Sequence, residues 1–161
     1  MLLQRLRRRL QGEREAGFTL IELMVVVLII AILIAIAIPT FLGARARAQD
    51  RAAQSSLRNA LTAEKTYYTD NQAYVATAGA AELKAIEPSL TFDAAANTAP
   101  IIGSVAYYLD GAGAITLGTK SASGTCFYVK DTPTGASAGT TYGTAAACPT
   151  PSAAAVASPK W

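Results

Sequence analysis

The stretch GFTLIELMVVVLIIAILIAIAIPTF, at residues 17–41, decides the fold of the N-terminal part of this chain. No residue from Leu23 to Ile38 is polar. A helix over Leu23–Ile38 would be about 24 Å long, and one from Phe18 to Leu42 about 37 Å. The hydrocarbon core of a bilayer is about 30 Å thick. The stretch therefore predicts a helix that can cross a membrane once.

Charge is distributed unevenly on the two sides of this stretch. The whole formal net charge of +3 lies before Phe18, where arginines outnumber the glutamates Glu13 and Glu15. These arginines are Arg5, Arg7, Arg8, Arg9 and Arg14. A basic segment beside an apolar helix faces the cytoplasm under the positive-inside rule, so we expect residues 43–161 on the other side of the membrane. A nucleic-acid-binding arm is the alternative interpretation of the basic segment, and the helix that follows directly disfavours it.

The helical pattern continues beyond the apolar stretch. Residues 43–69 contain many good helix formers and no proline. Apolar residues there recur three and four positions apart, at Leu57, Ala60, Leu61 and Tyr68. We predict a single helix from about Thr19 to about Thr69, bent near Pro39, apolar on all sides in its first half and amphipathic in its second.

The rest of the chain changes from helical to strand periodicity. A connector carries a short helix near Ala80 to Ile86, which Pro88 ends. Short runs rich in β-branched and aromatic residues follow at 105–109, 114–117 and 125–130, separated by DGAG and SASG, which are typical of hairpin turns. The predicted fold class is therefore α+β, a long N-terminal helix packed on an antiparallel meander of at least three strands.

Cys126 and Cys148 are the only cysteines, and the predicted topology places both outside the cytoplasm. An even pair there predicts a disulfide, worth about 3 kcal/mol if unstrained. It would tie the Gly-, Ser-, Thr-, Ala- and Pro-rich segment after Thr132 to the last strand. Two isolated cysteines without any histidine make a poor zinc site, so we expect neither a metal nor a cofactor.

The start of the apolar stretch resembles that of a type IV pilin precursor. The resemblance rests on Gly17, Phe18, Thr19, Leu20, Ile21 and Glu22, after a short basic leader and before an unbroken apolar helix. The segment YYTDNQAY at residues 67–74 resembles the helix exit of bacterial pilins and pseudopilins. The family implies that an aspartyl prepilin peptidase cuts between Gly17 and Phe18 and methylates the new amine of Phe18. The expected domains are a cleaved leader (1–17), a transmembrane and filament-core helix (18–42) and a globular head (43–161).

Glu22 and Pro39 each admit two interpretations. Glu22 is either a first-turn acid helped by the helix dipole, or an assembly residue that pairs with the Phe18 amine of a neighbouring subunit and sets the axial register. The second role is the one that the family resemblance implies. Pro39 either marks the membrane exit, or kinks the helix at a weak point, because the carbonyl of Ala35 loses its amide partner. By resemblance, the segment before Pro39 can unwind in the filament.

The resemblance implies a structural subunit, the major pilin of an extracellular type IV pilus. Its partners would be further copies of itself, the prepilin peptidase, the inner-membrane assembly machinery and, before assembly, membrane lipid. It would be a single-pass protein of the cytoplasmic membrane with its head outside, and then part of the fibre. Without histidine or a recognisable nucleophile motif, we expect no enzyme.

Several alternatives remain open from the sequence. Within the family, the chain could be a minor pilin or a type II secretion pseudopilin. In another class, the head could be an adhesin or a DNA-uptake module, with Lys120, Lys130 and Lys160 as the candidate contacts. The net charge near zero after residue 17 gives little attraction for DNA. An ordinary single-pass membrane protein is a third class, and it requires that Phe18 never becomes an N-terminus.

Overall fold

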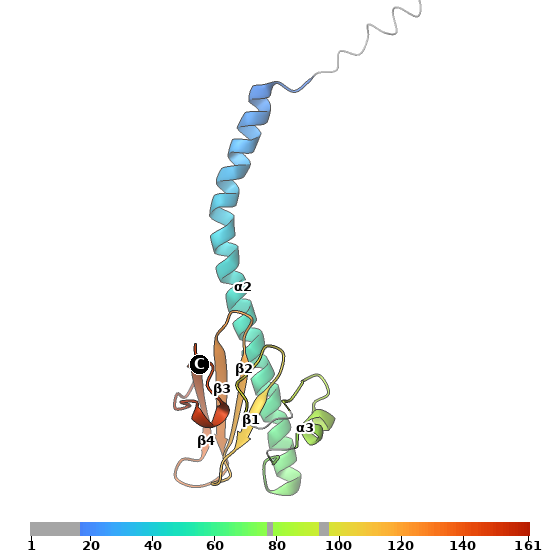
Figure 1. The fold of residues 1–161 in the computed structure, drawn as a ribbon, viewed down its shortest axis with the longest axis vertical. Helices are drawn as coiled ribbons and strands as arrows, with labels where there is room; N and C mark the ends of the chain where they lie inside the picture. The colour runs from blue at the N-terminus through green and yellow to red at the C-terminus, as the bar shows by residue number, and fades with distance from the viewer. Residues whose placement is uncertain (1–16, 77–78, 94–96) are drawn as a thin grey trace, which may run out of the picture. The chain divides into compact units, whose positions relative to one another are not determined.

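The computed structural model describes residues 17–76, 79–93 and 97–161 (Figure 1). The chain divides into two compact units, Met1–Leu42 and Gly43–Trp161. The predicted leader lies outside the described residues except for Gly17. Helix α2 spans Leu20–Asn71 and helix α3 spans Ala80–Ile86.

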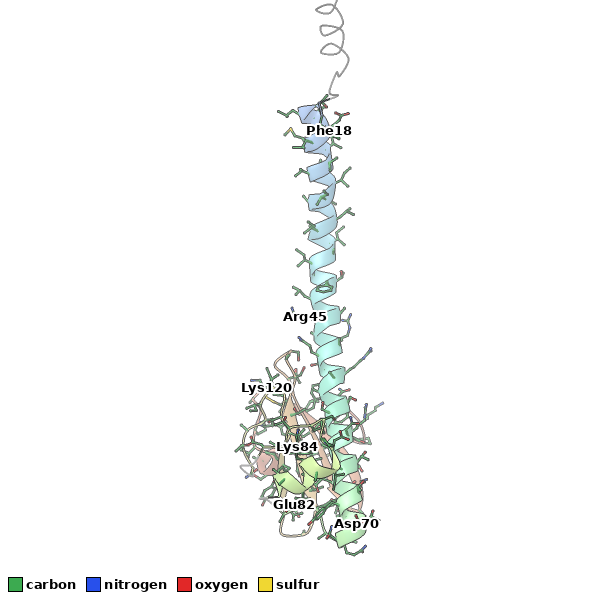
Figure 2. The ribbon with its side chains drawn as sticks, turned by 90° about the vertical axis from the view of Figure 1, so that its right-hand side faces the viewer. Phe18, Arg45, Asp70, Glu82, Lys84 and Lys120 are labelled. Carbon is green, nitrogen blue, oxygen red and sulfur yellow. A yellow bond between two sulfur atoms is a disulfide. The ribbon has the colours of Figure 1, made fainter. Side chains whose placement is uncertain are left out.

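Helix α2 is 52 residues long and confirms the predicted single helix within two residues at each end. In the first unit its side chains are exposed on all sides, as Figure 2 shows. Helical structure continues through Pro39, and the Thr40 hydroxyl donates to the carbonyl oxygens of Ile36 and Ala37, at 3.3 and 2.9 Å. A weak point at Pro39 stays a prediction.

The second unit contains a four-stranded antiparallel sheet in the order β1-β2-β3-β4. Its strands are β1 (Ala106–Leu109), β2 (Ile115–Lys120), β3 (Cys126–Thr132) and β4 (Gly139–Ala145). The first two connections are the predicted hairpin turns. Asp110 Oδ1 accepts the backbone N–H groups of Ala112 and Ala114, both at 2.9 Å, and Gly113 adopts φ +83°. The sequence thus predicts three strands and both turns between them.

The core of the second unit lies between the later turns of α2 and the sheet. Leu57 and Ala60 are fully buried and Leu61 nearly so, which confirms the predicted apolar face of the helix. Buried residues of the first three strands complete this core, among them Tyr107, Ile115, Leu117, Phe127 and Val129. Leu83 of α3 is also fully buried in it. Each fully buried large apolar side chain stabilises the head by about 1.5–3 kcal/mol.

Strand β4 and the C-terminal segment after it were not predicted. β4 pairs with β3 along its whole length, although its side chains are largely exposed or half-buried. A 3-10 helix (Pro151–Ala153) comes next, and Ser158 and Tyr142 then exchange two backbone hydrogen bonds of 2.7 and 3.0 Å. A Cβ at Gly143 would lie 2.3 Å from the carbonyl oxygen of Ala155, so this close approach requires glycine.

Trp161 packs at the border of the core, against β3, β4 and α2. Its ring meets those of Phe127 and Tyr142 edge-on, and its indole N–H donates to the carbonyl oxygen of Tyr128 at 3.0 Å. The guanidinium carbon of Arg58 lies 5.1 Å from the centre of the same ring. Backbone pairing, the Cys126–Cys148 disulfide and one indole therefore hold a segment that has few large apolar side chains of its own.

Candidate processing and assembly site

The start of α2 is fixed by a reciprocal cap between Thr19 and Glu22. The amide N–H of Glu22 donates to the Thr19 hydroxyl at 3.2 Å. In return, the Thr19 amide and hydroxyl both donate to Glu22 Oε2, at 2.8 and 2.7 Å. This is a capping box, in which a hydroxyl and a carboxylate three residues apart satisfy otherwise unpaired amides of the first turn. It also fits the interpretation of Glu22 as a first-turn acid.

The cap leaves the Glu22 carboxylate able to take a second partner. Only Oε2 is engaged among the described residues, and the side chain is exposed. Both members of the cap come after the peptide bond between Gly17 and Phe18. Cleavage at that bond would therefore leave the cap intact and place a new amine one residue before it.

Gly17 and Phe18 precede the first helical residue and are exposed, with 86% of the Phe18 surface open. A Cβ placed on Gly17 would meet no atom within 4 Å. The described chain therefore does not itself require glycine at this position. A protease that must approach the backbone closely would require it.

The helix beyond this cap is apolar without being buried. Every side chain from Leu20 to Leu42 is exposed, and within the described residues α2 is the one helix long and apolar enough to cross a membrane. A continuous apolar surface of this size marks a membrane or protein contact, because soluble monomers rarely expose one. The sequence predicts this property, and among residues 17–42 the structure describes nothing that covers the apolar surface.

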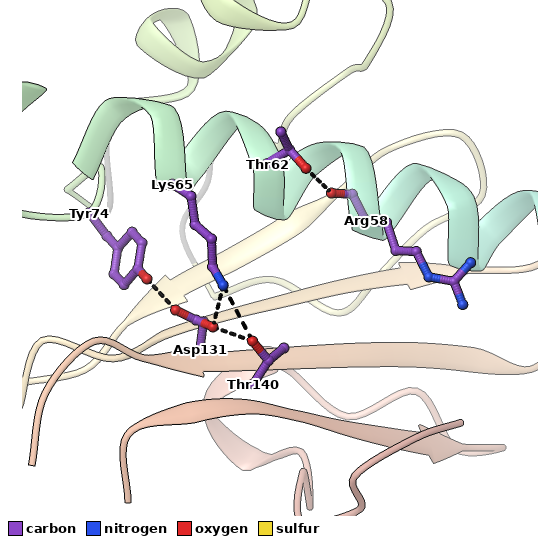
Figure 3. Close-up of polar contacts among 6 residues, drawn as sticks. All are labelled: Arg58, Thr62, Lys65, Tyr74, Asp131 and Thr140. Carbon is purple, nitrogen blue, oxygen red and sulfur yellow. Dashed lines mark hydrogen bonds and ion pairs between the residues drawn. The ribbon is translucent and has the colours of Figure 1, made fainter. Parts of the chain in front are cut away.

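A polar network ties α2 to the sheet (Figure 3). Asp131 of β3 forms an ion pair with Lys65 of α2 at 2.9 Å and accepts hydrogen bonds from the hydroxyls of Tyr74 and Thr140. Burial would raise the pKa of Asp131, but the bonds from Thr140, Tyr74 and Lys65 and the charge of Lys65 lower it. The network joins the helix, its exit segment, β3 and β4. Tyr74 lies in the segment that resembles the pilin helix exit.

Glu64 is a second polar group that the sequence did not reveal. It is fully buried, and its Oε2 accepts the backbone N–H of Val75 at 3.0 Å. Burial raises the pKa of Glu64 to about 7 against that hydrogen bond, which lowers it. Within the described residues, Glu64 Oε1 and the Tyr107 hydroxyl are buried without a hydrogen-bond partner. Its position, three residues after Leu61 and four after Ala60, places it on the predicted apolar face, and this spacing is the sequence signal that indicates burial.

The other predicted residues also have definite places. Cys126 and Cys148 form the predicted disulfide, with their Cα atoms 5.2 Å apart. Lys130, one of the three lysines considered for DNA, forms an ion pair with Asp110 at 3.2 Å. In the described part of the chain, no group of three or more His, Cys, Asp or Glu residues could hold a metal.

Comparison with known proteins points to the same N-terminal region. Residues 13–38 match the family described as the prokaryotic N-terminal methylation motif. The chain is 34% identical over 61 residues to the type IV major pilin protein PilA of Myxococcus xanthus. It is 40% identical over 79 residues to the type IV wide pilus major component PilA4 of Thermus thermophilus.

These matches are partial. They cover 38% and 47% of this chain, and 28% and 60% of the two relatives. No solved structure matches the chain. The methylation motif lies at the start of an exposed apolar helix, and the chain is similar to two major pilins. In its N-terminal half, the chain therefore resembles a type IV pilin precursor.

Proposed function

We propose that this chain is the major structural subunit of an extracellular type IV pilus. The observation that carries the proposal is the capped Glu22, four residues after Phe18, at the start of a fully exposed apolar helix within the methylation motif. Both relatives are named as major pilus components, which favours a major subunit over a minor pilin or a secretion pseudopilin.

Processing converts the precursor into an assembly-competent subunit. A prepilin peptidase cuts the exposed bond between Gly17 and Phe18 and methylates the new Phe18 amine. The basic leader (1–17) is lost, and the apolar helix (18–42) and the head (43–161) remain. The amine carries a positive charge that the precursor lacks at this position.

Assembly pairs that charge with Glu22. A carboxylate moved toward the centre of a bilayer costs about 3 kcal/mol even by the milder scales, so a partner is strongly favoured. The Phe18 amine of an incoming copy can approach the unengaged oxygen Oε1 while Thr19 holds Oε2. Because no residue from Leu23 to Ile38 is polar and could fix the register of the helices, this pair sets the axial spacing between copies.

The apolar helix serves in two surroundings in turn. In the cytoplasmic membrane lipid covers it while the head lies outside, and in the fibre the helices of other copies cover the same surface. Burial from water contributes about 25 cal/mol per Å² of apolar surface, which makes these helices the main source of cohesion. Pro39 provides the place where the helix unwinds under load. Extraction from lipid requires an energy-driven assembly machinery in the inner membrane.

The proposed role requires no catalysis. The two relatives are named as pilus components, and the site consists of a capped acid and a cleavage bond. The polar network around Asp131 ties structural elements together.

The abundance of the chain in fibres tests the proposal. Surface fibres are sheared from intact cells of the source organism, and their protein is quantified by gel densitometry and peptide counting. We expect this chain to be the predominant protein, and deletion of its gene to remove the fibres. A trace amount in fibres that persist after deletion would contradict a major subunit and indicate a minor one.

A further inference from the structure

The head carries three arginines without carboxylate partners at the beginning of its helix. Arg45, Arg47 and Arg51 are exposed on α2, and the ion pairs of the described residues, Lys65–Asp131 and Lys130–Asp110, involve none of them. The one acid in this stretch, Asp50, accepts a hydrogen bond of 2.5 Å from the Ser123 hydroxyl. Three arginines against one carboxylate leave this end of the head, the basic end, with a net positive charge.

The opposite end of the same helix carries uncompensated negative charge. Asp70 is exposed in the last turn of α2, and that turn contains no basic residue. The C-terminus of a helix already bears a partial negative charge, so a carboxylate there is unfavourable unless a cation approaches it. Glu82 of α3 is exposed as well and, like Asp70, takes part in no ion pair among the described residues. Figure 2 shows Asp70 and Glu82 at the end of the head away from Arg45.

The lysines near Asp70 and Glu82 form no ion pair with either carboxylate among the described residues. The Lys84 ammonium donates to the carbonyl oxygens of Pro88 and Leu90, at 2.8 and 2.6 Å. Lys65 is held by Asp131. Asp70 and Glu82 together form the acidic end of the head.

We propose that Arg47 and Arg51 of one copy form ion pairs with Asp70 and Glu82 of a second copy, so that heads associate end to end. The inference rests on the proposed function and names the head surface that assembly uses. A contact between two different surfaces of the same chain is heterologous, and repetition of such a contact generates an open filament. An anionic membrane surface would also attract the arginines, but it leaves the acidic end without a partner.

The sequence separation of the two ends predicts the axial translation between two associated copies. Arg47 and Asp70 are 23 residues apart on one helix, which corresponds to about 35 Å along its axis. Two copies joined by these ion pairs are therefore translated by about 35 Å along α2. A fibre map can measure this translation directly.

Charge reversal in the full chain tests the contact. We expect R47E/R51E and D70K/E82K each to reduce sheared fibre by about tenfold or more, because like charges would then face each other. The four substitutions together restore opposite charges, and fibre yield should recover to within about twofold of the unmodified chain. Amounts of mature, membrane-inserted subunit verify that each variant folds and is processed.

A matched single pair separates this contact from general charge effects. R51E and K160E change the charge equally, and both side chains are exposed. Lys160 precedes Trp161, whose ring packs on Arg58, away from both Arg47 and Asp70 along α2. We expect R51E to reduce the fibre yield and K160E to leave it unchanged. The inference would be overturned if the fourfold variant gave no more fibre than the two double variants, or if R47E/R51E gave a normal fibre yield. If R47E/R51E reduces fibre and D70K/E82K does not, the arginines bind an anionic surface and the inference is also wrong. Absence of this chain from fibres of unmodified cells would instead overturn the proposed function.

Discussion

The two units of this chain contrast in where their apolar residues find cover. In Gly43–Trp161, large apolar residues such as Leu57, Leu83 and Leu117 are fully buried. In the first unit, chemically equivalent residues such as Leu28 and Ile36 are 60% and 64% exposed. The head therefore buries its own apolar residues, whereas the described residues of the first unit leave those of the helix exposed.

The contrast extends to the polar groups. In the head, Asp131 is surrounded by a lysine and two hydroxyls that lower its pKa. At the start of α2, Glu22 has only the neighbouring Thr19, which engages one of its two oxygens. The Asp131 carboxylate thus has its partners within the fold, whereas Oε1 of Glu22 has none among the described residues.

The largest expected effect is the loss of fibre assembly with an unchanged head. Glu22→Ala removes the carboxylate that we propose to pair with the Phe18 amine. We expect membrane insertion and leader cleavage to continue and fibre growth to stop. Electron microscopy of sheared material and immunoblots of the membrane fraction measure the two effects. Normal fibres from this variant would remove the proposed role of Glu22.

A matched pair of leucine substitutions measures the contrast itself. Leu57→Ala should lower the free energy of unfolding of the head by about 2–5 kcal/mol, because it leaves a cavity in a packed core. Leu28→Ala should leave it unchanged within about 0.5 kcal/mol, since Leu28 has no packed surroundings in its own unit. Trp161 is the only tryptophan and packs on the head, so its fluorescence reports denaturant unfolding in detergent. Equal losses in both variants would show that the units are not independent.

Much of this contrast could be predicted from the sequence, because it rests on hydrophobic periodicity. The apolar run, the helix to Asn71, α3 and the first three strands arise from local pattern and turn residues. β4 could not be predicted, since its sequence GTTYGTA has no apolar alternation and pairs through backbone bonds with β3. The contacts of Trp161 depend on chain segments far apart in sequence, which no local pattern reports.

The residues of the candidate site and its cap are both predictable from the sequence. Gly17, Phe18 and Glu22 carry the family resemblance, and Thr19 and Glu22 have the three-residue spacing of a capping box before an apolar run. Only the structure shows which oxygen of Glu22 the cap engages. Glu64 was missed because its spacing fits the buried face while its chemistry is that of a solvated residue.

Removal of the disulfide should lower the stability of the head and leave the apolar helix (18–42) unchanged. Cys126→Ser together with Cys148→Ser opens the link between β3 and the segment after β4. We expect a loss of about 3 kcal/mol in the free energy of unfolding, mostly through the freer unfolded chain. Thermal unfolding of the oxidised chain and the double variant measures this loss, and equal helicity of the two chains below the transition is the control. An unchanged midpoint would show that β4 pairing alone holds the segment.

The smallest expected effect concerns pH and tests the buried acid of the head. The pKa of Glu64 is about 7 in the folded head, against the ordinary value of 4.5 that applies to the unfolded chain, so the folded state binds the proton more tightly. Its contribution to stability is complete below pH 4.5 and is lost as pH rises toward 7, by up to about 3 kcal/mol. The carboxyl groups of Asp110 and Asp131 act oppositely at lower pH, because their pKa values are lowered.

Glu64→Gln isolates this contribution. The amide cannot ionise, so the unfolding free energy of the variant should no longer fall between about pH 5 and 7. It should still fall below about pH 4, as in the unmodified chain. Unfolding free energies measured from pH 3 to 8 on both chains give the comparison. The same decline in both chains would show that Glu64 does not carry it.

The central claim is that one apolar helix is covered first by lipid and then by its own copies, after cleavage creates a partner for Glu22. Mass spectrometry of the N-terminal peptide from sheared surface fibres tests it most directly. The account predicts a peptide that begins at Phe18 with a methylated amine. Surface material that keeps residues 1–17 attached would contradict it.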